Sequence, residues 1–190
     1  MNFCKIFIIG LLISVVLSAT TCSNECPRGN LRLDSGSRNW LPLKGKRQLT
    51  FVDQSGTAVN YAIYVVDTLQ LYVKQPDCSG EYAYEYINVD LYLNTAKTDS
   101  IHCAMASGSW LSLWAVSSNK PSMTYGNLLG QPNSTSLKTR FSTLTLGNRS
   151  YSDVLLATSM ISNGGVDSVY IAYNYGLVGF SYQNQKYVLK

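Results

Sequence analysis

His102 is the single histidine of the 190-residue chain, so it is the first residue to consider as a general base. Its neighbours Ile101 and Cys103 place it within a predicted strand rather than on a pocket loop. A serine hydrolase of the α/β type also needs a glycine-flanked serine, Gly-x-Ser-x-Gly, on a sharp turn. The sequence contains no such pattern. These features favour a structural or surface histidine over a catalytic one.

Two carboxylates on one predicted strand, Glu81 and Glu85, are candidates for glycoside hydrolysis. That chemistry needs the carboxyl groups to lie roughly 5 to 9 Å apart across a cleft. At about 3.3 Å per residue of strand, these two are separated by somewhat more than that. The acidic residues Asp53, Asp67 and Asp99 are expected in solvated turns. We therefore predict no enzymatic site, and a hydrolase that uses Glu81, Glu85 or His102 remains the alternative.

The sequence predicts neither a cofactor nor a metal ion. No glycine cluster joins a strand to a helix, so a phosphate-binding loop is not expected. His102 and Cys103 are adjacent, and adjacent residues of a strand point to opposite faces of the sheet. They are therefore poorly placed to share one ion.

Tyrosine is the unusual component, with fourteen residues in the chain. Tyr82, Tyr84 and Tyr86 alternate with other residues and so share one face of a predicted strand. A row of phenol rings offers apolar area together with hydroxyl groups, which suits binding of a glycan or a protein. The alternative is that these rings pack under a loop or simply favour a strand.

The fold is predicted to be mainly β, because hydrophobic periodicity is close to two throughout. In the stretch "EYAYEYINVDLYLN", one face carries Ile87, Val89, Leu91 and Leu93 and the other carries the tyrosines. Hairpins are expected around residues 49–66, around "GNRS" and around residues 183–185, whereas the polar stretch 117–136 reads as a long loop. Gly176 and Gly179 mark a bulge or a close backbone approach. Roughly ten antiparallel strands would form a sandwich or a partly open barrel.

The N-terminus has the layout of a secretory signal peptide. Lys5 precedes an apolar run over residues 6–16, which is shorter than the roughly 20 residues of a membrane-spanning helix. Small residues follow, and cleavage is expected after Ser18 or Ala19, or directly before Cys22 if lipid is attached to that thiol. The predicted organisation is a signal peptide over residues 1–21, a flexible tether over 22–39 and a single β domain over 40–190.

Outside the cytosol cysteines can form disulfides. Four cysteines follow the predicted signal peptide, and four thiols allow three pairings. Cys78 and Cys103 flank the tyrosine-bearing strand, so they are expected to lie near each other in the sheet. Cys26 belongs to the predicted tether, and Cys22 is the lipidation candidate.

The net charge of +4 is spread through the chain without a basic block, so nucleic acid is not an expected partner. A lipid anchor would be the only contact with a membrane. The sequons at Asn133 and Asn148 leave open a glycosylated eukaryotic secreted domain as a further alternative.

Four segments resemble small β-rich lipoproteins of Gram-negative gut and environmental bacteria: "WLPLKGKRQLTFVDQSG", "CSGEYAYEYINV", "LGNRSYSDVL" and "VYIAYNYGLVGFSYQNQKYVLK". The resemblance implies an antiparallel sheet and a place in the bacterial envelope, at the outer membrane, periplasm or cell surface. It implies no catalytic residues. We therefore expect a secreted or lipid-anchored protein that binds or scaffolds, with a glycan or an envelope protein as its partner.

Overall fold

The computed structural model of the protein describes residues 32–72, 82–106, 110–118, 120–125, 128–129, 137–159 and 165–190. The described elements are the short helix α2 (Ser35–Arg38) and eleven strands. The strands are β1 (Gln48–Val52), β2 (Ala58–Tyr72), β3 (Tyr82–Tyr92), β4 (Ser100–Ala106), β5 (Trp110–Ser117), β6 (Lys120–Tyr125), β7 (Leu137–Leu146), β8 (Arg149–Thr158), β9 (Val166–Ala172), β10 (Gly176–Tyr182) and β11 (Gln185–Leu189). Within this part of the chain, no helix is long and apolar enough to cross a membrane.

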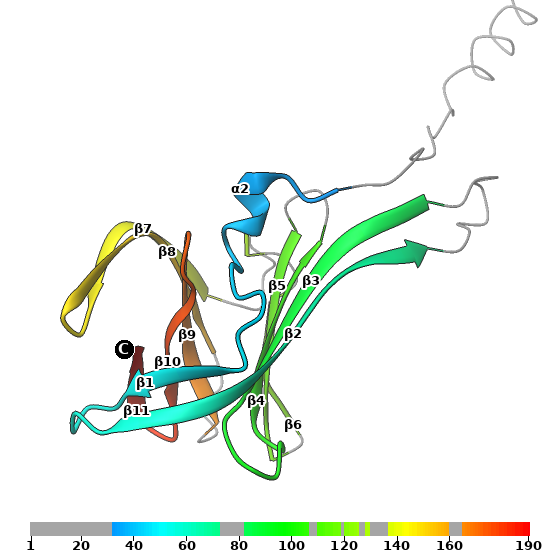
Figure 1. The fold of residues 1–190 in the computed structure, drawn as a ribbon. Helices are drawn as coiled ribbons and strands as arrows, with labels where there is room; N and C mark the ends of the chain where they lie inside the picture. The colour runs from blue at the N-terminus through cyan, green and yellow to red at the C-terminus, as the bar shows by residue number, and fades with distance from the viewer. Residues whose placement is uncertain are drawn as a thin grey trace, which may run out of the picture.

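All eleven strands belong to one antiparallel sheet with the order β6-β5-β4-β3-β2-β1-β11-β10-β9-β8-β7. Strands β1 to β6 and strands β7 to β11 each pair with their sequence neighbours, and the pairing of β1 with β11 joins the two series. Figure 1 shows this sheet curled into a half-barrel. The predicted mainly β fold is confirmed in its partly open barrel form. It is not a sandwich, because the strands make one continuous sheet.

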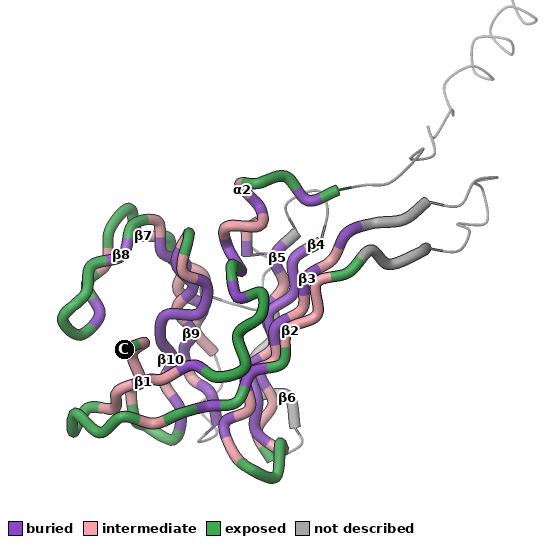
Figure 2. The backbone as a smooth tube through the Cα atoms, in the orientation of Figure 1, coloured by how far each residue is buried: buried purple, intermediate pink, exposed green. Residues whose placement is uncertain are grey.

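The core lies on the concave face of the curled sheet. In β3, Ile87, Val89 and Leu91 are buried, as is Leu93 just beyond its end, which confirms the predicted apolar face. Side chains of the same face of β4 and β5 continue this layer. Because the sheet curls, side chains of β1, β9 and β10 pack against the layer from the other half of the sheet. The buried stretches of both halves of the sheet are coloured purple in Figure 2. Period-two alternation thus places one side of each strand inside the half-barrel.

The N-terminal segment, residues 32–47, fills the open side of the half-barrel (Figure 1). Leu33, Trp40, Leu41 and Leu43 are buried in the same cluster as the sheet residues. This differs from the prediction of a tether through residue 39. The few apolar side chains of the segment are enough to order it, because the concave face of the sheet supplies the rest of the core.

Helix α2 within this segment is a single turn that begins at its N-cap, Asp34. The Asp34 carboxylate accepts hydrogen bonds from the Ser37 backbone N–H at 2.8 Å and from the Ser37 hydroxyl at 2.7 Å. Such a cap satisfies a backbone donor that has no partner within the helix. Trp40 follows, and its ring packs edge-on against Tyr173 with ring centroids 5.4 Å apart.

A buried polar contact joins the two halves of the curled sheet, β4 in one and β10 in the other. The Tyr182 hydroxyl, at the end of β10, donates a hydrogen bond to Asp99, just before β4. Asp99 also accepts one from the Ser118 backbone N–H at 2.6 Å. Burial alone would raise the pKa of Asp99, but these hydrogen bonds outweigh burial and hold the pKa below its ordinary value of 3.8. Asp99 is therefore not the solvated turn residue that was predicted, since it is 5% exposed.

A second, smaller core lies on the opposite face of β8 to β10. The far part of the β7–β8 hairpin bends over this face and buries Leu146 and Tyr151 against Val154, Ala172 and Val178. The hairpin itself was predicted, and its strands pair from Leu137↔Thr158 to Leu146↔Arg149. Its bend gives the sheet a second concave region beside the C-terminal strand (Figure 1).

Of the two glycines of the C-terminal strands, Gly179 has the predicted role and Gly176 has a different one. The pairing of β9 with β10 shifts register between Leu177 and Gly179, which is a bulge or an irregularity. A Cβ atom on Gly179 would lie 3.0 Å from the Tyr187 carbonyl oxygen, so the backbones approach too closely for a side chain. Gly176 has φ +77°, a conformation that favours glycine.

Truncating the core should cost far more stability than truncating the opposite face of the same strand. Leu91 is fully buried, so Leu91→Ala should lower the free energy of unfolding by about 2 to 5 kcal/mol. Tyr86→Ala, on the other face of β3, should cost clearly less. Urea denaturation followed by circular dichroism measures both, and a larger loss for Tyr86→Ala would mean that this ring belongs to the core.

Removing the hydroxyl of Tyr182 should destabilise the protein in a pH-dependent way. Tyr182→Phe should cost about 1.5 to 3 kcal/mol near pH 7, because a buried carboxylate loses a hydrogen bond. A carboxyl group with a lowered folded-state pKa stabilises the fold above its unfolded-state pKa and loses this effect as the pH falls through the folded-state value. The difference from wild type should therefore shrink below about pH 4.

Unfolding in urea at pH 7 and at pH 3 tests this expectation. Tyr170→Phe is the matched control, since Tyr170 is a half-buried tyrosine on β9. An equal loss for Tyr182→Phe at both pH values would contradict the role assigned to the Asp99 carboxylate.

Candidate functional site

The candidate site is a patch on the face of β2 to β5 opposite the core. We call it the outer-face patch; its members are Tyr64, Tyr86, Asn88, Asp90, Tyr92, Ser100, His102 and Trp114. The register of the sheet brings four of them into one row, Tyr64↔Asp90↔His102↔Trp114. These residues alternate with the buried ones, so burying Val89 and Leu91 turns Asp90 outward.

The polar centre of the patch is a chain of hydrogen bonds through His102. Its Nδ1 atom lies 2.7 Å from Asp90 Oδ1, and its Nε2 atom lies 2.7 Å from Ser100 Oγ. The Asn88 side-chain amide also donates to Asp90 Oδ1, at 2.7 Å. Four side chains are thus fixed relative to one another on two neighbouring strands.

The partners of His102 determine where its proton lies. A carboxylate only accepts hydrogen bonds, so Nδ1 carries hydrogen and donates to Asp90. In the neutral ring Nε2 is then the acceptor for the Ser100 hydroxyl. The arrangement orients the imidazole in one tautomer.

Aromatic rings surround this polar centre. The Trp114 indole stacks on the His102 ring with centroids 5.1 Å apart and planes 10° apart. Tyr64 is 58% exposed, the most open large hydrophobic residue among those described. Lys97 places its ammonium group 4.9 Å from the ring centroid of Tyr92. The patch therefore offers ring faces beside fixed hydrogen-bonding groups.

The carboxylate at the centre also affects the phenol groups around it. Burial, and then the negative charge of Asp90, raises the pKa of Tyr86 and of Tyr92. Both hydroxyls therefore remain protonated over a wider pH range than a free tyrosine. They can donate hydrogen bonds to a ligand at any physiological pH.

The order Ser100–His102–Asp90 matches the connectivity of a serine hydrolase triad. Two features separate the site from a working nucleophile. Ser100 is only 3% exposed, so a substrate carbonyl has little access to its hydroxyl. Strand β4 is paired on both sides, by β3 and β5, so its backbone N–H groups belong to the sheet rather than to an oxyanion hole.

Of the predicted binding residues, Tyr86 lies in the outer-face patch. Tyr82 and Tyr84 belong to β3, but their side chains lie outside the described part of the structure. Sequence reasoning missed Asp90 and Trp114 as partners of His102, and Tyr64 as the residue beside Asp90. The signal for them is the pairing register, which one strand's own sequence does not contain.

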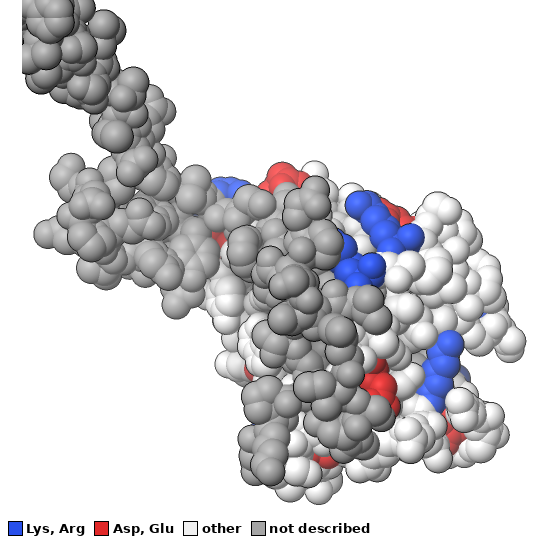
Figure 3. Space-filling model, turned by 180° about the vertical axis from the view of Figure 1, so that it is seen from behind, with Lys and Arg blue, Asp and Glu red and all other residues white. Residues whose placement is uncertain are grey.

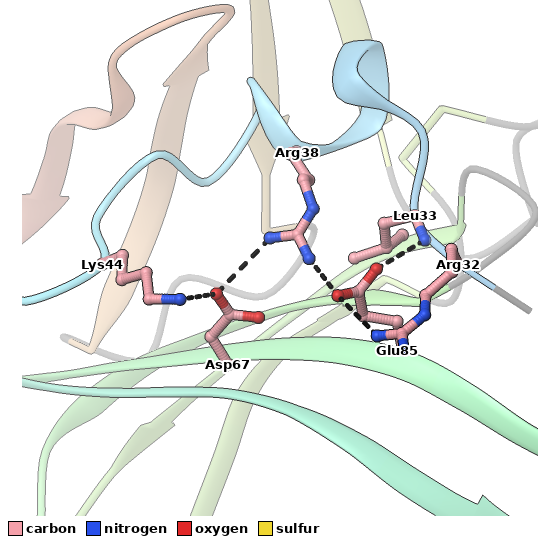
Figure 4. Close-up of polar contacts among 6 residues, drawn as sticks. All are labelled: Arg32, Leu33, Arg38, Lys44, Asp67 and Glu85. Carbon is pink, nitrogen blue, oxygen red and sulfur yellow. Dashed lines mark hydrogen bonds and ion pairs between the residues drawn. The ribbon is translucent and has the colours of Figure 1, made fainter. Parts of the chain in front are cut away.

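Glu85, a carboxylate of the alternative hydrolase hypothesis, is part of an internal ionic cluster (Figure 4). It is 7% exposed and faces the concave side of the sheet. Its Oε2 atom accepts a hydrogen bond from the Leu33 backbone N–H at 2.8 Å, and its Oε1 atom pairs with the Arg38 guanidinium. Arg32 lies 3.7 Å from the same oxygen. These contacts hold the N-terminal segment on the sheet.

Asp67 completes the cluster from the neighbouring strand. It lies 3.4 Å from Arg38 Nη1 and 3.2 Å from Lys44 Nζ. The prediction that Asp67 sits in a solvated turn is wrong, because the residue lies within β2. A small cavity of about 130 Å³ beside Arg38 and Asp67 is lined by residues of this segment and of β2 and β3.

Cys103 lies in β4 and points into the core, opposite to His102 as predicted. Burial raises the pKa of its thiol to about 12, so the thiolate is scarcely formed at neutral pH. Glu81, Cys22, Cys26 and Cys78 lie outside the described residues. The predicted proximity of Cys78 to Cys103 stays a prediction.

No group of three His, Cys, Asp or Glu side chains within the described ranges is arranged to hold a metal ion. Figure 3 shows one face of the molecule, on which the described Lys and Arg side chains form separate small groups.

Comparisons of the chain with protein-family models, with curated proteins and with solved structures find no match.

Proposed function

We propose that the protein is a binding module whose outer-face patch holds a neutral glycan outside the cytosol. The observation that carries this proposal is the row Tyr64, Asp90, His102 and Trp114, which places exposed ring area beside side chains already locked by hydrogen bonds. Sugar rings present apolar C–H faces and hydroxyl edges. A surface that combines aromatic rings with oriented donors and acceptors matches both.

The chemistry of the centre favours hydroxyl groups over charged ligands. Asp90, which His102 and Asn88 hold in place, disfavours an anion and can accept hydrogen bonds from hydroxyl groups, while Tyr86 and Tyr92, whose pKa values are raised, supply neutral donors. Because these side chains are held in place, little side-chain entropy is lost when a ligand binds.

The expected affinity for one sugar unit is low. Each stacked ring contributes about 1 kcal/mol. Three rings, those of Tyr64, Tyr86 and Trp114, therefore give about 3 kcal/mol, which is weaker than the roughly 4 kcal/mol of millimolar binding. Useful retention requires a polymer that touches several rings at once, so a polysaccharide is a better ligand than a monosaccharide.

The proposal also includes where the protein acts, which is the bacterial envelope. An exported chain anchored through lipid on Cys22, or released after its signal peptide is cut, would meet polysaccharides at the bacterial envelope. An envelope protein is the other partner that such a surface suits.

Removing rings from the patch should weaken retention by a polysaccharide. We expect native gel electrophoresis through soluble neutral polysaccharides (β-glucan, mannan or xylan) to retard the wild-type protein with at least one of them. The double change Tyr64→Ala and Trp114→Ala should reduce the apparent affinity by about tenfold or more, since two contacts of about 1 kcal/mol are lost.

Tyr170→Ala is the control, because it removes a half-buried tyrosine from β9. Circular dichroism and urea unfolding should show that the double variant remains folded. Equal retardation of the wild type and the folded double variant, or retardation of neither by any of the three polymers, would contradict the glycan proposal.

The second candidate function is a serine hydrolase, and the hydrogen-bond chain Ser100–His102–Asp90 is the observation that favours it. A fluorophosphonate probe, which phosphorylates activated serines, separates the two candidates. We expect no adduct on Ser100 after prolonged incubation, because the hydroxyl is buried. An adduct that maps to Ser100 by mass spectrometry and is lost in His102→Ala would establish the hydrolase instead.

A further inference from the structure

A cleft of about 340 Å³ lies between the turn of the β7–β8 hairpin and the ends of β1 and β11. Its lining comes from three segments: Val52 and Asp53, residues 146–149, and residues 188–190. Figure 1 shows the hairpin curling towards the C-terminal end of the chain, which forms the opposite wall. The cleft is separate from the outer-face patch, which lies on β2 to β5.

The walls of the cleft are mostly aliphatic. Val52, Leu146, Val188 and Leu189 line it from both sides. Clefts that bind small molecules in proteins typically have volumes of about 300 to 1,000 Å³, with apolar walls and a few polar groups. This cleft therefore suits the apolar body of a small ligand.

Arg149 supplies a positioned cation at the hairpin turn. Its guanidinium carbon lies 4.7 Å from the ring centroid of Tyr175 and 5.4 Å from that of Tyr151. The two rings pack edge to face with centroids 5.2 Å apart, so they form a fixed support. Contact with the two rings holds the guanidinium beside the cleft, where its N–H groups can pair with an anion.

Arg149 makes no ion pair within the described part of the chain, where no carboxylate lies within salt-bridge distance of its guanidinium. Arg140, on the same hairpin, contrasts with it, since Arg140 makes two hydrogen bonds to Asp153 at 2.6 and 2.8 Å. Burial raises the pKa of the neighbouring Tyr151, and the positive charge of Arg149 opposes this rise, so the guanidinium lies close to that phenol.

Asp53 is the one acidic side chain in the lining, and its own turn occupies it. The carboxylate accepts hydrogen bonds from the backbone N–H groups of Ser55 and Thr57, both at 2.9 Å, and from the Ser55 hydroxyl at 2.6 Å. Lys190 adds a second cationic side chain to the lining. The remaining negative charge of Asp53 disfavours a dianion such as phosphate more than a single carboxylate.

We propose that this cleft is a second binding site, which takes a small molecule with an apolar body and one carboxylate. The aliphatic walls hold the body, and the Arg149 guanidinium pairs with the carboxylate through its N–H groups. This site does not depend on the glycan proposal, because the two share no residue.

Methyl NMR of the full-length protein with 4-phenylbutyrate tests the proposal. We expect shifts of the methyl signals of Val52, Leu146, Val188 and Leu189 that saturate at millimolar probe. The neutral 4-phenylbutyramide, which has the same apolar body, should bind at least about tenfold more weakly, because charge-assisted hydrogen bonds contribute more than neutral ones.

Arg149→Gln should weaken 4-phenylbutyrate to the level of the amide, whereas Arg140→Gln should leave its affinity unchanged. Comparison of the two probes on the wild-type protein stands even if the Arg149 variant is poorly folded. Two outcomes would overturn the proposal: an absence of shifts at these methyl groups, or equal affinity of the wild-type protein for the acid and the amide.

Discussion

The contact between Arg38 and Glu85 is the interaction on which the half-barrel depends. Curling one sheet creates a concave apolar face with an open side, and the N-terminal segment covers it only if Glu85 keeps a partner there. A buried carboxylate without a partner is destabilising, and Glu85 takes all its partners from this segment: the Arg38 guanidinium, the Leu33 backbone N–H and Arg32. The same guanidinium reaches Asp67, so one side chain ties the segment to two strands.

Filling the concave side has a direct effect on the opposite face. Because side chains alternate, each strand that sends Val89, Cys103 or Leu113 inward must send its neighbours outward. In β3 to β5 those neighbours are Asp90, His102 and Trp114, and the antiparallel register sets them side by side. The candidate site is thus a product of core packing, and its geometry is as rigid as the sheet beneath it.

Local patterns in the sequence were sufficient for the fold class, the buried face of β3, the main hairpins and the close approach at Gly179, since each is decided by residues near in the chain. Long-range pairings could not be found that way. The ionic role of Glu85 is one of them, because its partner, Arg38, is 47 positions away. Residues 32–39 were read as a tether because their core is provided by other strands. The hydrogen bonds of His102 required the register of β3 against β4, which no single strand encodes.

The pairing of β1 with β11 has a consequence for how the chain folds. Phe51, in the first strand, pairs with Leu189, in the last, and this is the contact that unites the two series of hairpins. Hairpins form quickly from local contacts, whereas a contact of such long sequence separation carries a large loop-closure entropy and is slow to form. The two series can therefore assemble early and independently, and the sheet becomes continuous only after the final strand has been synthesised. A chain translocated before that point would cross a membrane without a completed sheet to unfold.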